Sequence, residues 1–75
     1  MSTYPAVGSR AVKKALRRAG WVPRQGKGHT IFSKEGRTIP VDDDQERFSA
    51  GLLAAMRKQS GLSRSEFIEM LKGKG

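Results

Sequence analysis

The fold of this chain is decided by the stretch WVPRQGKGHTIFSKEGRTIPV, which runs from residue 21 to residue 41. It contains three runs that favour β-strands, separated by two turns that contain glycine. The runs are Trp21–Gln25, His29–Ser33 and Arg37–Val41, and the turns are Gly26–Gly28 and Lys34–Gly36. Side chains alternate in character along the later runs, so we predict an antiparallel meander with one wet face. Pro23 lacks a backbone donor, which places the first run at an edge or a bulge.

A helix is predicted before the meander. Ser9 is a favoured N-cap residue, and Gly20 is a favoured C-terminal stop. Between them apolar residues recur at helical spacing, at Val12, Ala15, Leu16 and Ala19. Five cations share the opposite face of this helix: Arg10, Lys13, Lys14, Arg17 and Arg18.

Two helices are predicted after the meander. We expect the acidic triplet Asp42–Asp44 to open the first of them, because acids stabilise a helix N-terminus. The apolar stripe of this helix is expected at Phe48, Leu52, Leu53 and Met56, and its end at Gly61. Ser63–Glu66 has the pattern of a capping box, which predicts a last short helix. Its apolar residues are Phe67, Ile68 and Leu71.

The predicted order is α-β-β-β-α-α, a small α+β domain with a three-stranded antiparallel sheet and helices on one face. A chain of 75 residues buries only roughly 60% of the surface that its unfolded form exposes, so it has material for one core. We therefore expect a single domain over residues 1–75, with residues 1–8 and 72–75 loosely held. Trp21 and Phe32 are expected to pack in the core rather than to stack on bases.

The charge of the chain is unevenly distributed. Lys and Arg number 15 against 7 Asp and Glu, and the net charge is +8. Every acid lies at or after Glu35, so the first 34 residues hold the whole excess of cations. This asymmetry indicates a polyanionic partner. Nucleic acid fits better than a membrane, because no strongly basic stretch has a richly apolar opposite face.

The cations of the first helix are candidates for that contact. We take Lys13, Lys14, Arg17 and Arg18 as RNA-binding candidates, because a helix face of a single sign is suited to phosphates. The alternative is an ordinary solvated helix face, although such a face normally mixes both signs.

Composition limits the other kinds of site. Without Cys there is no thiolate zinc site, and one His is too few for the usual nitrogen ligand sets. We therefore expect no metal and no cofactor, and we interpret Asp42–Asp44 as a helix cap rather than a magnesium site. The N-terminus lacks the apolar core of a secretory signal, and no run approaches the roughly 20 apolar residues of a membrane span. A cytoplasmic location is expected.

His29 is the one histidine of the chain and the strongest catalytic candidate. Imidazole acts as an acid or a base near neutral pH. Lys27 and Gly28 precede it in the glycine-containing turn, and Arg24 and Arg37 lie in the neighbouring runs. We take these four residues as RNA-binding candidates, since cations and an open backbone suit phosphates. The alternatives are a structural histidine, and glycines that only close a hairpin.

Such a site suits the cleavage of RNA, which carries its own nucleophile in the 2′-hydroxyl group. A minimal ribonuclease needs a base for that proton and positive charge for the transition state. His29 is expected to supply the base, and Lys27 the charge. With one histidine in the chain, the leaving oxygen must take its proton from water or Lys27, so slow turnover is expected.

Several short motifs follow one another at a characteristic spacing. After the helix that starts at Ser9 come Ala19-Gly20-Trp21, Arg24-Gln25, Gly28-His29 with Phe32, Ile39-Pro40-Val41, Gly51-Leu52-Leu53 and Lys58-Gln59-Ser60-Gly61-Leu62. Their order resembles that of the HicA family of bacterial toxin ribonucleases, whose partners are HicB antitoxins. The resemblance covers nearly the whole chain.

The resemblance implies a double-stranded-RNA-binding-like fold and the cleavage of mRNA by the histidine of a Gly-Ser-His type motif. Only His29 can inherit that role here. Gly28 stands where Ser often precedes the histidine, and Thr30 where a second histidine often follows. The resemblance further implies a toxin of a type II toxin–antitoxin system, an endoribonuclease that acts on single-stranded mRNA. Its partner would be a HicB-type antitoxin that covers His29.

Two other functions fit the residues. The first is a non-catalytic RNA- or DNA-binding module that uses the same cations for phosphate contacts alone. The second is a helical adaptor whose basic face docks an acidic protein. Cleavage that depends on His29 separates the ribonuclease from both of them.

Overall fold

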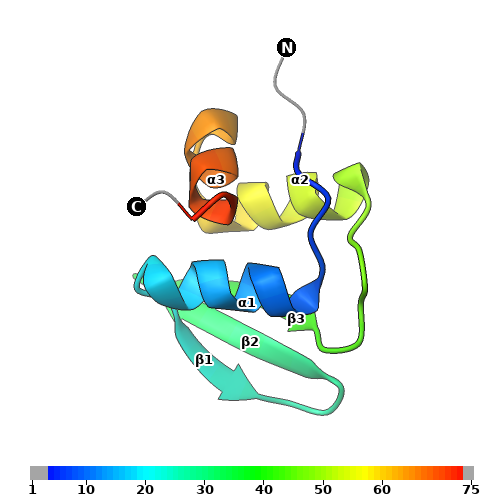
Figure 1. The fold of residues 1–75 in the computed structure, drawn as a ribbon. Coiled ribbons are helices and arrows are strands. Elements are labelled where there is room, and N and C mark those ends of the chain that lie inside the picture. The colour runs from blue at the N-terminus through cyan, green and yellow to red at the C-terminus, as the bar shows by residue number, and fades with distance from the viewer. Residues whose placement is uncertain (1–3, 74–75) are drawn as a thin grey trace.

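A computed structural model of the chain describes residues 4–73. Its elements are α1 (Ser9–Arg18), β1 (Val22–Gln25), β2 (His29–Lys34), β3 (Arg37–Asp42), α2 (Ala50–Ser60) and α3 (Arg64–Leu71). The predicted order α-β-β-β-α-α is confirmed, and the strands agree with the predicted runs to within one residue. The molecule is a small α+β domain whose helices lie on one side of the sheet (Figure 1).

The sheet is antiparallel in the order β1-β2-β3, with β2 at its centre. Thr30 of β2 pairs with Val41 of β3, and Phe32 pairs with Ile39. All four side chains are buried, so they form the inner face toward the helices. The residues of β1 are exposed along its whole length. Pro23 lies in this edge strand, where a missing backbone donor is tolerated.

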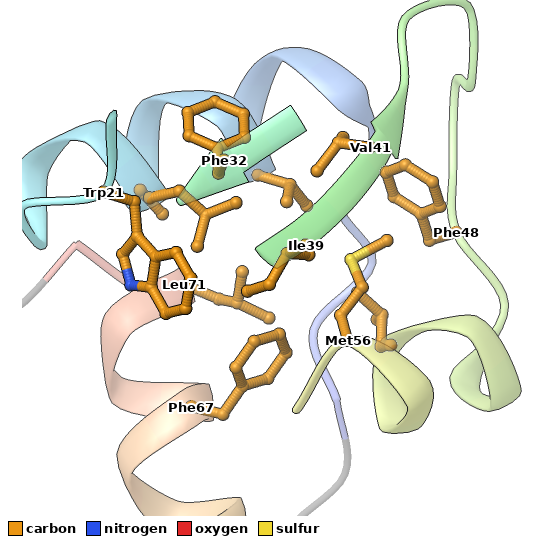
Figure 2. Packing of buried hydrophobic residues seen from close by; sticks show 12 residues of the cluster. Trp21, Phe32, Ile39, Val41, Phe48, Met56, Phe67 and Leu71 are labelled. Carbon is orange, nitrogen blue, oxygen red and sulfur yellow. The ribbon is translucent and has the colours of Figure 1, made fainter. Parts of the chain in front are cut away.

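The core lies between the inner face of the sheet and the three helices (Figure 2). Its members share near-complete burial and come from every element except β1: Val12, Ala15, Leu16, Trp21, Phe32, Ile39, Val41, Phe48, Leu53, Met56, Phe67 and Leu71. The prediction that Trp21 and Phe32 pack in the core is confirmed, since they are 4% and 0% exposed. Neither side chain is available for stacking on a base.

The predicted role of Ser9 as an N-cap is wrong. The N-cap of α1 is Gly8, and Ser9 is the first helical residue, with a buried side chain. Its hydroxyl donates to the carbonyl oxygen of Asp42 and accepts from the backbone N–H of Gln45 at 2.9 Å. Ser9 therefore joins the start of α1 to the segment after β3, a tertiary contact that local capping patterns do not reveal.

The predicted start of the second helix at Asp42–Asp44 is also wrong. Asp42 ends β3, and α2 begins only at Ala50. Its N-cap is Ser49, whose hydroxyl accepts from the N–H of Leu52 at 3.2 Å. A Ser N-cap already satisfies that donor, so the helix does not need the acids.

The other predicted helix boundaries are confirmed. Gly61 follows α2 in the left-handed conformation with φ +78°, which favours glycine. The capping box of α3 is complete, because Ser63 and Glu66 bond each other's backbone N–H groups at 2.9 and 3.2 Å. Phe67, Ile68 and Leu71 are buried as expected.

The predicted apolar stripe of α2 is only half correct. Leu53 and Met56 are buried in the core. Phe48 is also buried but lies before the helix, and Leu52 is 44% exposed. The buried face of α2 therefore begins at Leu53 and includes fewer residues than the sequence indicates.

The segment before α1, which we expected to be loosely held, is packed from Tyr4 onward. The ring of Tyr4 meets Phe67 edge-on at 6.2 Å, and the guanidinium of Arg64 lies 5.3 Å from the centre of the Tyr4 ring. The carbonyl of Val7 accepts from the N–H of Phe48 at 2.9 Å. At the other end, the N–H groups of Lys72 and Gly73 donate to the carbonyls of Ile68 and Met70 at 3.0 and 3.1 Å. Residues 1–3 and 74–75 lie outside the described residues.

Gly8→Ala should destabilise the protein, because a Cβ at this position would overlap the carbonyl oxygen of Glu46. Relieving such an overlap typically costs about 1–3 kcal/mol of unfolding free energy. Gly51→Ala is the matched control, since a Cβ there meets only the hydroxyl of Ser49, at 3.9 Å. Alanine in a helix is favoured over glycine by roughly 0.5–1 kcal/mol. Urea denaturation measures both, and equal stability of the two variants would contradict this packing.

Candidate active site at the β1–β2 hairpin

His29 is the first residue of β2, and its Cα partner across the sheet is Asp42 on β3. Thr30 points into the core, so His29 lies on the outer, helix-free face of the sheet. Its side chain is half-buried. A Cβ on Gly26 would lie 3.0 Å from Nε2 of His29. The imidazole can therefore occupy this position because Gly26 has no side chain.

The turn before His29 is tight and exposed. The N–H of Gly26 donates to the carbonyl of His29 at 2.8 Å, which closes the hairpin. Lys27 and Gly28 are exposed at its tip. Gly28 has φ +72°, and no atom outside its chain neighbours lies within 4 Å of the position of a Cβ there. The backbone beside His29 is thus open to a ligand on one side.

The carboxylate of Asp43 fastens this hairpin to α1. Its Oδ1 accepts from Nζ of Lys13 at 2.9 Å and from the hydroxyl of Thr30 at 2.8 Å. Its Oδ2 accepts from Nε2 of Gln25 at 2.8 Å. The backbone N–H of Asp43 donates to the carbonyl of Gly28 at 3.0 Å. Asp43 therefore holds residues of α1, β1, β2 and the turn at the same time.

These donors change the acidity of Asp43. The hydrogen bonds from Lys13, Gln25 and Thr30 lower the pKa of the Asp43 carboxyl from 3.8 to about 2. The side chains of Lys13 and Asp43 are each one-fifth exposed, and within residues 4–73 theirs is the only salt bridge. Asp43 is therefore ionised at every pH at which the protein would work.

The basic face of α1 lies beside the same carboxylate. Arg10, Lys14 and Arg17 are exposed, and together with Lys13 and Asp43 they line a shallow depression. The first helix thus brings its cations next to the hairpin through the Lys13–Asp43 pair. The cationic face of α1 therefore has one acid beside it, Asp43, which comes from a distant part of the sequence.

The other predicted site residues lie at different distances from His29. Arg24 is exposed and pairs with Ile31, which makes it a diagonal neighbour of His29 on the outer face. Arg37 begins β3 at the far end of the sheet, where its guanidinium packs against Gly61.

Lys34, the Cα partner of Arg37, is five residue steps along β2 from His29, or roughly 17 Å. Arg18 lies at the last turn of α1, and its guanidinium approaches Gly73 after α3. The structure thus brings Lys27, Gly28 and Arg24 near His29, joins the first turns of α1 to the turn through Asp43 on the other face of the sheet, and leaves Arg37 and Arg18 away from it.

Ligands for a metal ion do not come together in the described part of the chain. Residues 4–73 contain no group of three His, Asp or Glu side chains placed to hold one. Of the acidic triplet, Asp43 is occupied by Lys13, Gln25 and Thr30. No helix among these residues has the length and apolar character to cross a membrane.

Sequence reasoning missed the roles of Asp43, Gln25 and Thr30. Asp43 is 30 residues from Lys13 and 18 from Gln25 in the chain, so no local pattern connects them. The only available signal is the polar character of Gln25 and Thr30 in strand positions next to the histidine.

Comparisons with protein-family models, with curated proteins and with solved structures found no match for this chain.

The acid sensitivity of the fold should depend on Asp43. Its pKa is below the unfolded value, so its stabilising effect is present above about pH 4 and is lost as the pH falls toward 2. Asp43→Asn should flatten the decline of the thermal midpoint in this range. Glu69→Gln is the control, because Glu69 is exposed on α3 and accepts none of the hydrogen bonds that Asp43 accepts. An Asp43→Asn variant whose acid decline matched that of the parent would contradict this assignment.

Proposed function

We propose that this protein is a metal-independent endoribonuclease, the toxin of a type II toxin–antitoxin system, and that His29 is its catalytic base. The observation that carries the proposal is the placement of a half-buried imidazole beside an open, cationic turn. The sequence resemblance to HicA toxins supports the same role for His29. A binding module would need the cations but not an imidazole in this position.

His29 would act on the 2′-hydroxyl group of a bound ribonucleotide. The imidazole takes the proton of this hydroxyl, and the 2′-oxygen attacks the adjacent phosphorus. The P–O5′ bond breaks, which leaves a 2′,3′-cyclic phosphate and an O5′ that takes a proton from water or from Lys27. Lys27 and the open backbone at Gly28 stabilise the charge that develops on the phosphate oxygens.

The bound RNA would pass over the tip of the hairpin. The cations of α1 and the outer-face residues His29 and Arg24 lie on the two sides of this tip. A single strand that wraps the tip can place phosphates on both sides, whereas a rigid duplex cannot follow so tight a turn. Single-stranded mRNA is therefore the substrate that we propose. The neutralising partner would be a HicB-type antitoxin that covers His29.

His29→Ala should abolish RNA cleavage and keep the fold. The loss of a general base typically costs about 10² to 10⁴ in rate, and the unfolding free energy should change by about 1 kcal/mol or less. Ser33→Ala is the matched control, because Ser33 is exposed on the same face of the same strand. Cleavage rate and thermal midpoint are measured for all three proteins.

Two results would count against a catalytic His29. Cleavage by His29→Ala at the parental rate would remove the base from the mechanism. If the parent protein did not cleave RNA, and the parent and His29→Ala bound RNA equally well, the non-catalytic binding module would be supported instead.

Cleavage should continue in excess chelator, because the mechanism uses no metal ion. The measurement compares the rate of RNA cleavage with and without EDTA. A rate that vanished with EDTA and returned with magnesium would overturn the mechanism.

RNA affinity should fall steeply with salt, and replacing Lys13, Lys14, Arg17 and Arg18 by Met should make the fall less steep. The slope of log affinity against log salt should decrease by roughly 0.7 for each lost contact to a single strand. We expect Lys14 and Arg17 to contribute more than Lys13, which Asp43 neutralises, or Arg18, which lies near Gly73. Lys58→Met is the control, since Lys58 is exposed on α2. An unchanged slope would exclude α1 as an RNA platform.

A further inference from the structure

We infer that Asp43 is a positioning residue for the proposed reaction, which holds the His29 turn in one geometry without touching RNA. The inference rests on the proposed function for its catalytic consequence. Its structural half, the tether between Asp43 and the turn, can be measured without any activity.

Besides the backbone pairing of β1 with β2 and the bond from the Gly26 N–H to the His29 carbonyl, the turn has few other means of staying in place. The residues of β1 are all exposed, so this strand contributes no side chain to the core. The turn itself contains Gly26 and Gly28, which are the most freely rotating residues in an unfolded loop. Neither burial nor chain stiffness therefore defines the direction of the hairpin.

Hydrogen bonds from residues of both strands to Asp43 fix the direction of the hairpin. Thr30, the residue after His29, donates to Oδ1 at 2.8 Å. Gln25, the residue before the turn, donates to Oδ2 at 2.8 Å, and its Nε2 lies 2.9 Å from the carbonyl of Gly26. The backbone of Asp43 holds Gly28 at 3.0 Å. Residues on both sides of His29 are thus bound to Asp43, either to its carboxylate or to its backbone N–H.

Asp43 acts from the opposite face of the sheet to His29. Thr30 points inward and His29 points outward, since consecutive strand residues alternate. The carboxylate is also shared with Lys13 of α1, which fixes it in turn to the helix. Asp43 therefore affects the imidazole only through the backbone of the turn, and its loss should lower kcat more than it raises KM.

The test compares Asp43→Ala with Thr30→Val. The alanine variant removes every side-chain bond of the tether, whereas valine keeps the buried shape of Thr30 and removes only its hydroxyl. If Asp43→Ala does not fold, Asp43→Asn takes its place, because asparagine keeps the size of the side chain. Ser63→Ala is the control, because it loses a cap of α3 far from the hairpin.

Two readouts separate positioning from general destabilisation. We expect amide exchange of Gly26, whose N–H is bonded to His29, to speed up at least tenfold in Asp43→Ala relative to Ser63→Ala. We expect kcat to fall at least tenfold in Asp43→Ala and at least threefold in Thr30→Val. The thermal midpoint of Thr30→Val should stay near the parental value, whereas a merely structural role requires kcat to follow the midpoint.

Unchanged exchange at Gly26 in Asp43→Ala would overturn the tether. Faster exchange with parental kcat in both hairpin variants would overturn the positioning role and leave the ribonuclease standing. A parent without any cleavage would overturn the proposed function together with the catalytic half of this inference, and the exchange rates would still decide the tether.

Discussion

The bonds that Asp43 accepts from Lys13, Gln25 and Thr30 are the interaction on which this end of the molecule depends. A core built from helices and the inner face of the sheet fixes β2 and β3, but it includes no residue of β1. The position of the first hairpin is therefore determined by polar contacts. Because one carboxylate accepts from three elements, its removal would take this acceptor from Lys13, Gln25 and Thr30 at once.

This arrangement brings a cost and a benefit to a protein of net charge +8. A carboxylate among the cations of α1 weakens the attraction for phosphates, and Lys13 is the cation most affected. In exchange, the turn that carries His29 has a defined geometry against the helix. A small domain has little core to spare for its surface turns, so an ion pair with several hydrogen bonds takes the place of apolar packing.

The sequence predicted the parts of the fold that depend on local patterns. The meander follows from turn residues and alternation, and Gly61 and Ser63 mark helix boundaries by their own conformational preferences. Ser9 and Asp43 were misplaced because each resembles a cap and instead makes contacts 30 or more residues away. The geometry around His29 could not be predicted for the same reason, because its contacts join residues far apart in the sequence. His29 is a candidate by its chemistry alone, whereas its tether and its distance from Arg37 depend on the register of the sheet.

The chemistry of the cleaved ends tests the central claim most directly. A base that activates the 2′-hydroxyl group leaves a 2′,3′-cyclic phosphate and a 5′-hydroxyl, and it cannot cut at a nucleotide that lacks this hydroxyl. The measurement is mass spectrometry of the products from a short RNA and from the same RNA with a 2′-deoxy substitution at the cleaved position. The account predicts cyclic phosphate ends from the first and no cut at that position in the second. Products with a 3′-hydroxyl and a 5′-phosphate, or cleavage at the deoxy position, would contradict it.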